Sequence, residues 1–124
     1  MWLVLAFALA GCTQRRALNA ADCPGQDGII AHVADDPDQP GAPPSFDRAT
    51  VTAWGHDANG QSVDVTVPFD ASGCAQIAVP GGSYSIGTAV PDPHGCSWYD
   101  TQHVDYPGGG RMKVDLRVRQ QCIF

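Results

Sequence analysis

The stretch that decides the fold reads Phe69-Asp-Ala-Ser-Gly-Cys-Ala-Gln-Ile-Ala-Val-Pro-Gly-Gly-Ser-Tyr-Ser-Ile-Gly-Thr-Ala-Val90. On both sides of Pro80-Gly81-Gly82, apolar residues alternate with small or polar ones, which is typical of half-buried strands. Proline cannot donate to a sheet ladder and glycine turns freely, so this tripeptide separates two strands. The Asp70-x-x-Gly73 turn opens the first of them. The pattern predicts a β-hairpin on which the rest of the chain packs.

The same alternation recurs along the chain. We expect five further strands, at residues 28–34, 49–55, 62–69, 102–106 and 112–119. The last is the most regular, because a slip of one residue would bury its charged side chains. The chain also has 14 Gly and 10 Pro, which suits a fold with many turns. These features predict an all-β fold, a seven-stranded and mainly antiparallel β-sandwich.

Length and charge limit the number of domains and the classes of function that the chain can have. With 124 residues the chain has room for one domain. Its formal net charge is −6, and no dense cluster of Lys and Arg occurs. Because phosphate contacts need clustered cations, nucleic-acid binding is disfavoured.

The N-terminal residues predict the compartment. Residues 1–11 form an uncharged apolar run that is too short to cross a bilayer, which takes about 20 residues, but fits the core of a secretory signal. Leu9-Ala10-Gly11-Cys12 resembles the lipobox of bacterial lipoproteins, although no Lys or Arg precedes the run. The alternative, a buried apolar strand, is disfavoured by Arg15-Arg16 just beyond it.

The lipobox resemblance implies three segments. Residues 1–11 would be a signal peptide, 12–22 a tether that is lipid-anchored at Cys12, and 23–124 the folded domain. The partner at Cys12 is then a membrane, and the location is the bacterial cell envelope. Thr13 is not an aspartate, which by resemblance to lipoprotein sorting rules implies the outer membrane in a cell that has two.

Four cysteines are left once Cys12 is assigned to lipid: Cys23, Cys74, Cys96 and Cys122. An even number in a small exported domain indicates two disulfides, with three pairings open. We expect Cys74–Cys96 and Cys23–Cys122, because the predicted hairpin brings the first pair to one edge. No Cys-x-x-Cys occurs, so a metal site at these residues is disfavoured.

Several short motifs together resemble the carboxypeptidase regulatory-like domain. They run from Gly28 to Val118 and are Gly28-Ile-Ile-Ala, Pro40-Gly-Ala, Ala49-Thr-Val-Thr, Asn59-Gly60, Asp70-x-x-Gly73, Pro80-Gly-Gly-Ser-Tyr-Ser-Ile86 and Val114-Asp-Leu-Arg-Val118. The resemblance implies a prealbumin-like (transthyretin-like) β-sandwich. The chain departs from the family pattern at residues 43–48 and 91–100, where extra residues occur. Loops on such scaffolds commonly carry function.

Three aromatic residues are candidates for ligand binding. Trp54, Trp98 and Tyr99 would form a platform for a sugar or a peptide. The alternative is that they cover the ends of a small core, where aromatic rings bury much apolar area. An exposed, contiguous patch that contains them would favour the platform.

Metal and catalytic sites are poorly supported. The four histidines (His32, His56, His94 and His103) include no closely spaced pair, so we expect surface residues, no metal and no cofactor. Asp35, Asp36 and Asp38 lack the regular ligand spacing of a calcium loop. Intradiol dioxygenases bind iron through two tyrosines and two histidines, and this chain has Tyr84, Tyr99 and Tyr106 but not the histidine pair. No Gly-x-Ser-x-Gly motif occurs either.

The sequence therefore predicts a non-catalytic, membrane-anchored lipoprotein of the cell envelope. It would act as a structural or protein-interaction module through its edge strands and the loops at 35–45 and 91–100. Its expected partners are the membrane, an envelope protein or a glycan. The alternatives are a carbohydrate- or peptide-binding receptor and, third, a metal-dependent enzyme.

Overall fold

A computed structural model describes residues 19–35, 49–91 and 96–122. One short 3-10 turn and seven strands occur there: η1 (Ala20–Asp22), β1 (Gly28–Asp35), β2 (Thr50–Asp57), β3 (Ser62–Pro68), β4 (Cys74–Ile77), β5 (Gly82–Pro91), β6 (Cys96–Tyr106) and β7 (Arg111–Cys122). The all-β prediction is confirmed, and each of the seven expected strands overlaps a strand of the structure; β6, however, begins at Cys96, well before the expected strand 102–106. The signal peptide, Cys12, Asp36, Asp38 and His94 lie outside the described residues.

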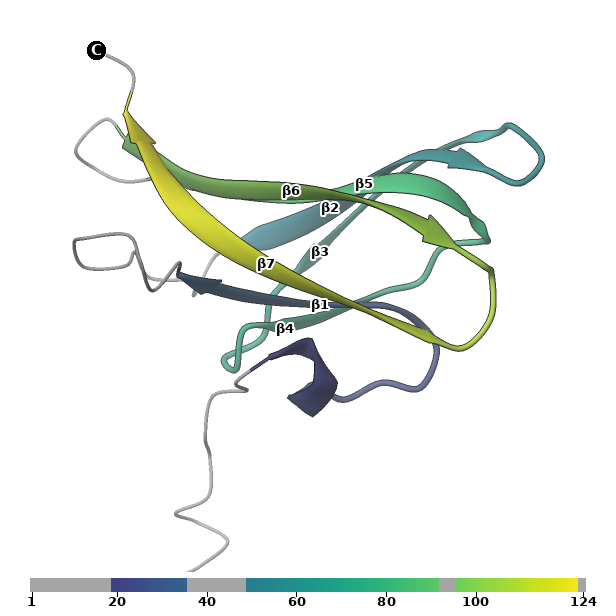
Figure 1. Cartoon of the computed structure of the whole chain (residues 1–124), viewed down its shortest axis with the longest axis horizontal. Coiled ribbons are helices and arrows are strands. Elements are labelled where there is room, and N and C mark those ends of the chain that lie inside the picture. Colours follow the sequence, from purple (N-terminus) through teal and green to yellow (C-terminus); the bar gives the residue numbers. More distant parts are fainter. Residues whose placement is uncertain (1–18, 36–48, 92–95, 123–124) are drawn as a thin grey trace, which may run out of the picture.

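The strands form one continuous sheet in the order β3-β2-β5-β6-β7-β1-β4. All neighbours are antiparallel except β1 and β7, which run parallel, so the sheet is mixed. The sheet curls until its two edge strands, β3 and β4, come into contact without pairing. Figure 1 shows the resulting nearly closed shape, with β6, β5 and β2 on one side and β1 and β4 on the other. The predicted pair of separate, face-to-face sheets is thus replaced by a single folded one.

Strand β7 joins the two sides of the fold. Its residues 111–118 pair with β1, and its residues 119–122 pair with β6. In Figure 1 this strand runs diagonally across the molecule, from beside the start of β1 to the start of β6. β7 therefore holds β1 and β4 against the other four strands.

The predicted hairpin at residues 69–90 is wrong, because its two strands do not pair. β4 pairs with β1, whereas β5 lies between β2 and β6. The linker crosses between the two sides: Gly81 O accepts a hydrogen bond from Ala58 N at 2.8 Å, and a Cβ on Gly82 would lie 2.3 Å from His56 O. The Tyr84 hydroxyl donates to Pro80 O at 2.6 Å and fixes this crossing.

The core lies inside the curled sheet and follows the predicted alternation. Its fully buried members include alternate residues of β1, β2, β5 and β7: Ile29, Val33, Val51, Ala53, Tyr84, Ile86, Leu116 and Val118. Val63, Val65 and Val67 are only half-buried, because β3 is an edge strand. Burial, with a smaller contribution from the Asp57 carboxylate, raises the pKa of Tyr84.

Candidate functional site

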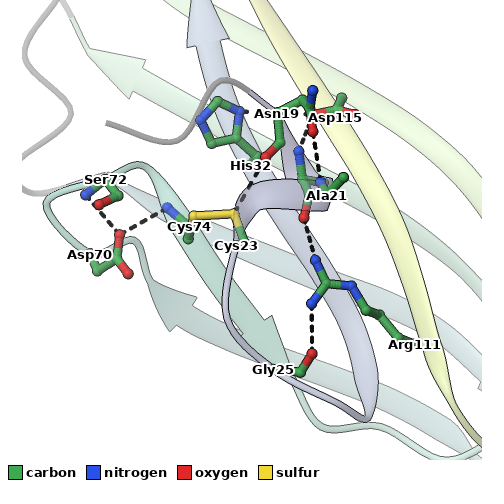
Figure 2. Close-up of a disulfide and its surroundings, with 11 residues drawn as sticks. Asn19, Ala21, Cys23, Gly25, His32, Asp70, Ser72, Cys74, Arg111 and Asp115 are labelled. Atoms are coloured by element: carbon green, nitrogen blue, oxygen red, sulfur yellow. Dashed lines mark hydrogen bonds and ion pairs between the residues drawn. A yellow bond between two sulfur atoms is a disulfide. The ribbon is translucent and has the colours of Figure 1, made fainter. Parts of the chain in front are cut away.

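A disulfide joins the N-terminal segment to the start of β4 across the outer face of β1. Cys23 is bonded to Cys74, their Cα atoms lie 5.7 Å apart, and both residues are buried. The expected pairings Cys74–Cys96 and Cys23–Cys122 are therefore wrong. Because β4 pairs with β1, Cys74 lies beside His32 on β1 instead of near Cys96 on β6. Figure 2 shows the bond between the N-terminal segment and the start of β4.

The N-terminal segment 19–25 is docked on the sheet by side chains of β7. Asp115 Oδ1 accepts from Ala20 N at 2.7 Å. Arg111 donates to Ala20 O at 2.5 Å and to Gly25 O at 2.6 Å. Asn19 caps the 3-10 turn, since its Oδ1 accepts from Ala21 N at 2.8 Å (Figure 2). Residues Asn19–Asp22, which the sequence assigned to the tether, are thus part of the folded unit.

A second, small apolar cluster lies under this segment. Ile30 is fully buried and packs with Cys23 and Cys74 rather than with the main core. Neighbouring residues of a strand face opposite sides, so Ile30 lies on the outer face of β1 while Ile29 lies in the core. The segment 19–25 therefore covers apolar surface that the sheet alone would leave exposed to water.

The three histidines that the structure describes do not converge. His32 is buried, contrary to the prediction of surface histidines, and its Nδ1 lies 3.8 Å from Asp115 Oδ1. His56 and His103 are exposed. Within residues 19–35, 49–91 and 96–122, no three His, Cys, Asp or Glu side chains gather closely enough to hold a metal ion.

The three candidate aromatic residues separate into two groups. Trp54 and Tyr99 are 42% and 44% exposed, whereas Trp98 is 2% exposed and belongs to the core. Residues 96–99 were expected in a loop but form the start of β6, so Trp98 and Tyr99 must face opposite sides of the sheet. A three-residue platform is excluded, and Trp54 and Tyr99 are left as a pair.

This pair flanks an open hollow on the outer face of β2, β5 and β6. The hollow measures about 420 Å³ and is lined by Thr50, Thr52, Trp54, Gly87, Thr88, Ala89, Tyr99 and Thr101. Alternation along β2 places Thr50 and Thr52 on the same face as Trp54, opposite the buried Val51. No lining residue is charged. The hollow thus joins apolar ring surface to neutral hydroxyl groups.

Gly87 forms the floor of the hollow. It lies in register between Thr52 on β2 and Thr101 on β6. A Cβ at this position would lie 3.0 Å from the indole of Trp54 and 3.0 Å from Thr101 Oγ1. The Trp54 ring therefore packs directly over the Gly87 backbone. A side chain at this position would occupy part of the hollow.

The hydroxyl groups of the hollow differ in what they bond. The Thr88 hydroxyl donates to Thr50 O at 2.7 Å, and the Thr52 hydroxyl lies 2.9 Å from that of Thr66. Within the described part of the chain, the Tyr99 and Thr101 hydroxyls make no hydrogen bond to protein. These two groups are available to a ligand. No carboxylate or histidine lines the hollow to activate a nucleophile.

No family model, curated protein or solved structure matches this chain. Among the described residues, no helix has the length and apolar character needed to cross a membrane.

Proposed function

We propose that this chain is a non-catalytic lipoprotein of the bacterial cell envelope, held at the membrane by lipid on Cys12 and acting as an interaction module. The observation that supports export is the buried Cys23–Cys74 disulfide. Disulfides persist in oxidising compartments and are rare in a reducing cytosol. Cys23, the first cysteine of this bond, lies shortly after the lipobox-like Leu9-Ala10-Gly11-Cys12 in the sequence.

The resemblance to the carboxypeptidase regulatory-like sandwich belongs to the same proposal. An all-β fold of seven strands supports it. The parallel pairing of β1 with β7 departs from the mainly antiparallel sheets that we expected. An interaction through strand addition would use β3, because this strand pairs with β2 on one edge and with no strand on the other, where it contacts β4 without pairing.

The test of the proposed anchor is the intact mass of the membrane-extracted protein, measured with and without reductant. We expect a chain that lacks residues 1–11 and carries acyl groups on Cys12. Reduction should add one hydrogen for each disulfide-bonded sulfur. A soluble species that retains Met1 and has only free thiols would contradict both anchor and export.

A second candidate function is the binding of a neutral glycan in the hollow between Trp54 and Tyr99. The supporting observation is the exposure of these two rings beside the unbonded Tyr99 and Thr101 hydroxyls. Sugars present apolar C–H faces that stack on aromatic rings, and their hydroxyls pair with neutral polar groups. The uncharged lining favours a neutral sugar over a charged peptide.

Tryptophan fluorescence tests this binding, because Trp54 is the exposed tryptophan of the described residues and Trp98 is buried. We expect neutral oligosaccharides such as chitotetraose or cellotetraose to change the emission of the wild type in a saturable way. Trp54→Ala and Tyr99→Ala should abolish binding measured by calorimetry. Lys113→Ala, an exposed site on β7, is the matched control and should bind normally. Equal binding by all four proteins would refute the site.

A further inference from the structure

We infer that Cys96 and Cys122 form a second disulfide, which closes the junction between β6 and β7. The two residues are direct partners in the antiparallel register of these strands. The same register continues through Ser97 with Gln121, Trp98 with Gln120 and Tyr99 with Arg119. The pairing of the cysteines thus belongs to a ladder of consecutive residues.

The backbone spacing of such partners suits a disulfide. Residues directly opposite each other in an antiparallel pair have Cα atoms about 4.5 or 5.5 Å apart, depending on the type of pair. Disulfides span Cα distances of about 4.4–6.8 Å. Opposite residues also share one face of the sheet. The Cα separation of either kind of pair therefore lies within the range that a disulfide spans.

The remaining cysteines support the same pairing. Cys23 and Cys74 are bonded to each other, and Cys12 is assigned to lipid in the proposed function. Cys96 and Cys122 are then the two that are left, and the fold brings them opposite each other. This inference rests on the proposed function for the lipid at Cys12 and for an oxidising compartment, whereas the register of the two cysteines is independent of it, and the test below supplies the oxidant directly.

The bond forms by thiol–disulfide exchange with a disulfide-bonded oxidant. The thiolate of one cysteine attacks a sulfur of the oxidant, forms a mixed disulfide and releases one oxidant thiolate. The thiolate of the second cysteine then attacks the protein sulfur and releases the other oxidant thiolate. The two thiols lose two protons and two electrons, and the oxidant takes up the electrons as its disulfide is reduced.

The position gives the bond a role in the architecture. β6 and β7 pair only over residues 96–99 and 119–122, and this short ladder joins the β1 side of the sheet to the β6 side. A covalent bond at the end of that ladder holds the junction closed. The two disulfides then fix opposite sides of the fold, one at the N-terminal segment and one near the C-terminal end of β7.

The test is a non-reduced peptide map of the full chain after oxidative refolding in a glutathione buffer. Trypsin alone leaves Cys74 and Cys96 on one peptide, residues 49–111, so it cannot separate the possible pairings. A second digestion with chymotrypsin cuts after Tyr84 and places each cysteine on its own fragment. We expect a fragment with Cys96 linked to residues 120–124, which carry Cys122.

Thiol labelling under denaturing conditions without reductant gives an independent readout. Cys96→Ser should expose one new labelled thiol at Cys122, and Cys122→Ser one at Cys96, while Cys23 and Cys74 stay unlabelled. Cys23→Ser is the matched control and should leave Cys96 and Cys122 unlabelled. Labelled Cys96 and Cys122 in the refolded wild type, a bond from either residue to Cys23 or Cys74, or a link between two chains would overturn the inference. The wild-type map decides the matter even where a variant fails to fold.

Discussion

Removing the Cys23–Cys74 disulfide should destabilise the domain by about 4 kcal/mol. The bond closes a loop with a sequence separation of 51 residues. In the loop-entropy model, a cross-link over a loop of this length removes about 14 cal/mol/K of entropy from the unfolded chain, which is about 4 kcal/mol at 25 °C. A small domain has a net stability of about 5–15 kcal/mol, so the loss is a large fraction of the total.

The assay is urea unfolding of the wild type and of the double variant Cys23→Ala/Cys74→Ala, followed by circular dichroism. The double variant removes both sulfur atoms of this bond, so neither partner is left as a free thiol, and it keeps the residues Asp115 and Arg111 that hydrogen-bond to the N-terminal segment. We expect a lower midpoint and a steeper dependence on urea, because the unfolded chain without the cross-link exposes more surface. Arg111→Ala with the disulfide intact is the control that loosens the segment without opening the loop.

The reasoning would be refuted by a loss below about 1 kcal/mol in the double variant with an unchanged slope. Such a result would mean that the unfolded chain is already compact around this pair, so that the cross-link removes little entropy. A loss as large in Arg111→Ala as in the double variant would instead show that docking of the segment, rather than loop closure, supplies the stability.

Three further predictions follow from individual contacts. Gly87→Ala places a Cβ 3.0 Å from the Trp54 indole and should displace that ring. We expect calorimetry to show glycan binding weakened at least about tenfold, at a cost in stability of about 1 kcal/mol or less. Gly109→Ala, whose Cβ meets nothing within 4 Å, is the control and should bind normally. Asp115→Ala should cost about 1 kcal/mol and speed hydrogen exchange at the Ala20 amide, whereas Asp115→Asn keeps an acceptor and should do neither; unchanged exchange in Asp115→Ala contradicts the contact. Tyr84→Phe should cost about 1 kcal/mol at pH 7 through the lost hydrogen bond to Pro80 O. Because the folded-state pKa of Tyr84 is raised above its ordinary value of 10.0, the unfolded chain releases this proton first, so its contribution is complete below pH 10.0 and is lost as pH rises through the folded pKa. The fall in wild-type stability above pH 10.0 should therefore be shallower in Tyr84→Phe, as measured by urea unfolding at several pH values, and an equal fall in both proteins would contradict it.

The positions of the strands could be predicted because alternation is a local property of the sequence. Most strands have their apolar residues on one side, as β7 shows most regularly, whereas β1 also carries Ile30 on its outer face. Which strands pair is not local. Residues 69–90 read as a hairpin, but Pro80-Gly81-Gly82 carries the chain across to β2, and the contacts that fix this crossing come from Ala58 and His56.

The wrong predictions for the disulfides and for the aromatic residues have two causes. The first is a wrong strand pairing, and the second is a wrong strand boundary. The expected pairing of Cys74 with Cys96 rested on the hairpin, and it fails because β4 pairs with β1. Trp98 and Tyr99 were assigned to a loop together. Once β6 is known to begin at Cys96, alternation alone separates them into a core residue and a surface residue.

The docking of residues 19–25 had no signal in the local sequence. It depends on Asp115 and Arg111, which lie about 90 positions further along the chain and reach the segment only after β7 has paired with β1. In contrast, the row formed by Thr50, Thr52 and Trp54 on one face of β2 was readable from alternation. What joins this row into a hollow is the register of Gly87 and Thr101 on the neighbouring strands.

The parallel pairing of β1 with β7 has a consequence for the order in which the chain folds. Gly28 pairs with Arg111 and Asp35 with Val118, so the first strand finds its parallel neighbour only after almost the whole chain has been made. Contacts of such long range make folding slow, because the loop between the strands must be closed before the contact stabilises anything. A chain that emerges N-terminus first therefore carries β1 with an open edge until β7 arrives. We expect the domain to stay unfolded through synthesis and to complete its fold in a single late step, a delay that would suit the export proposed above.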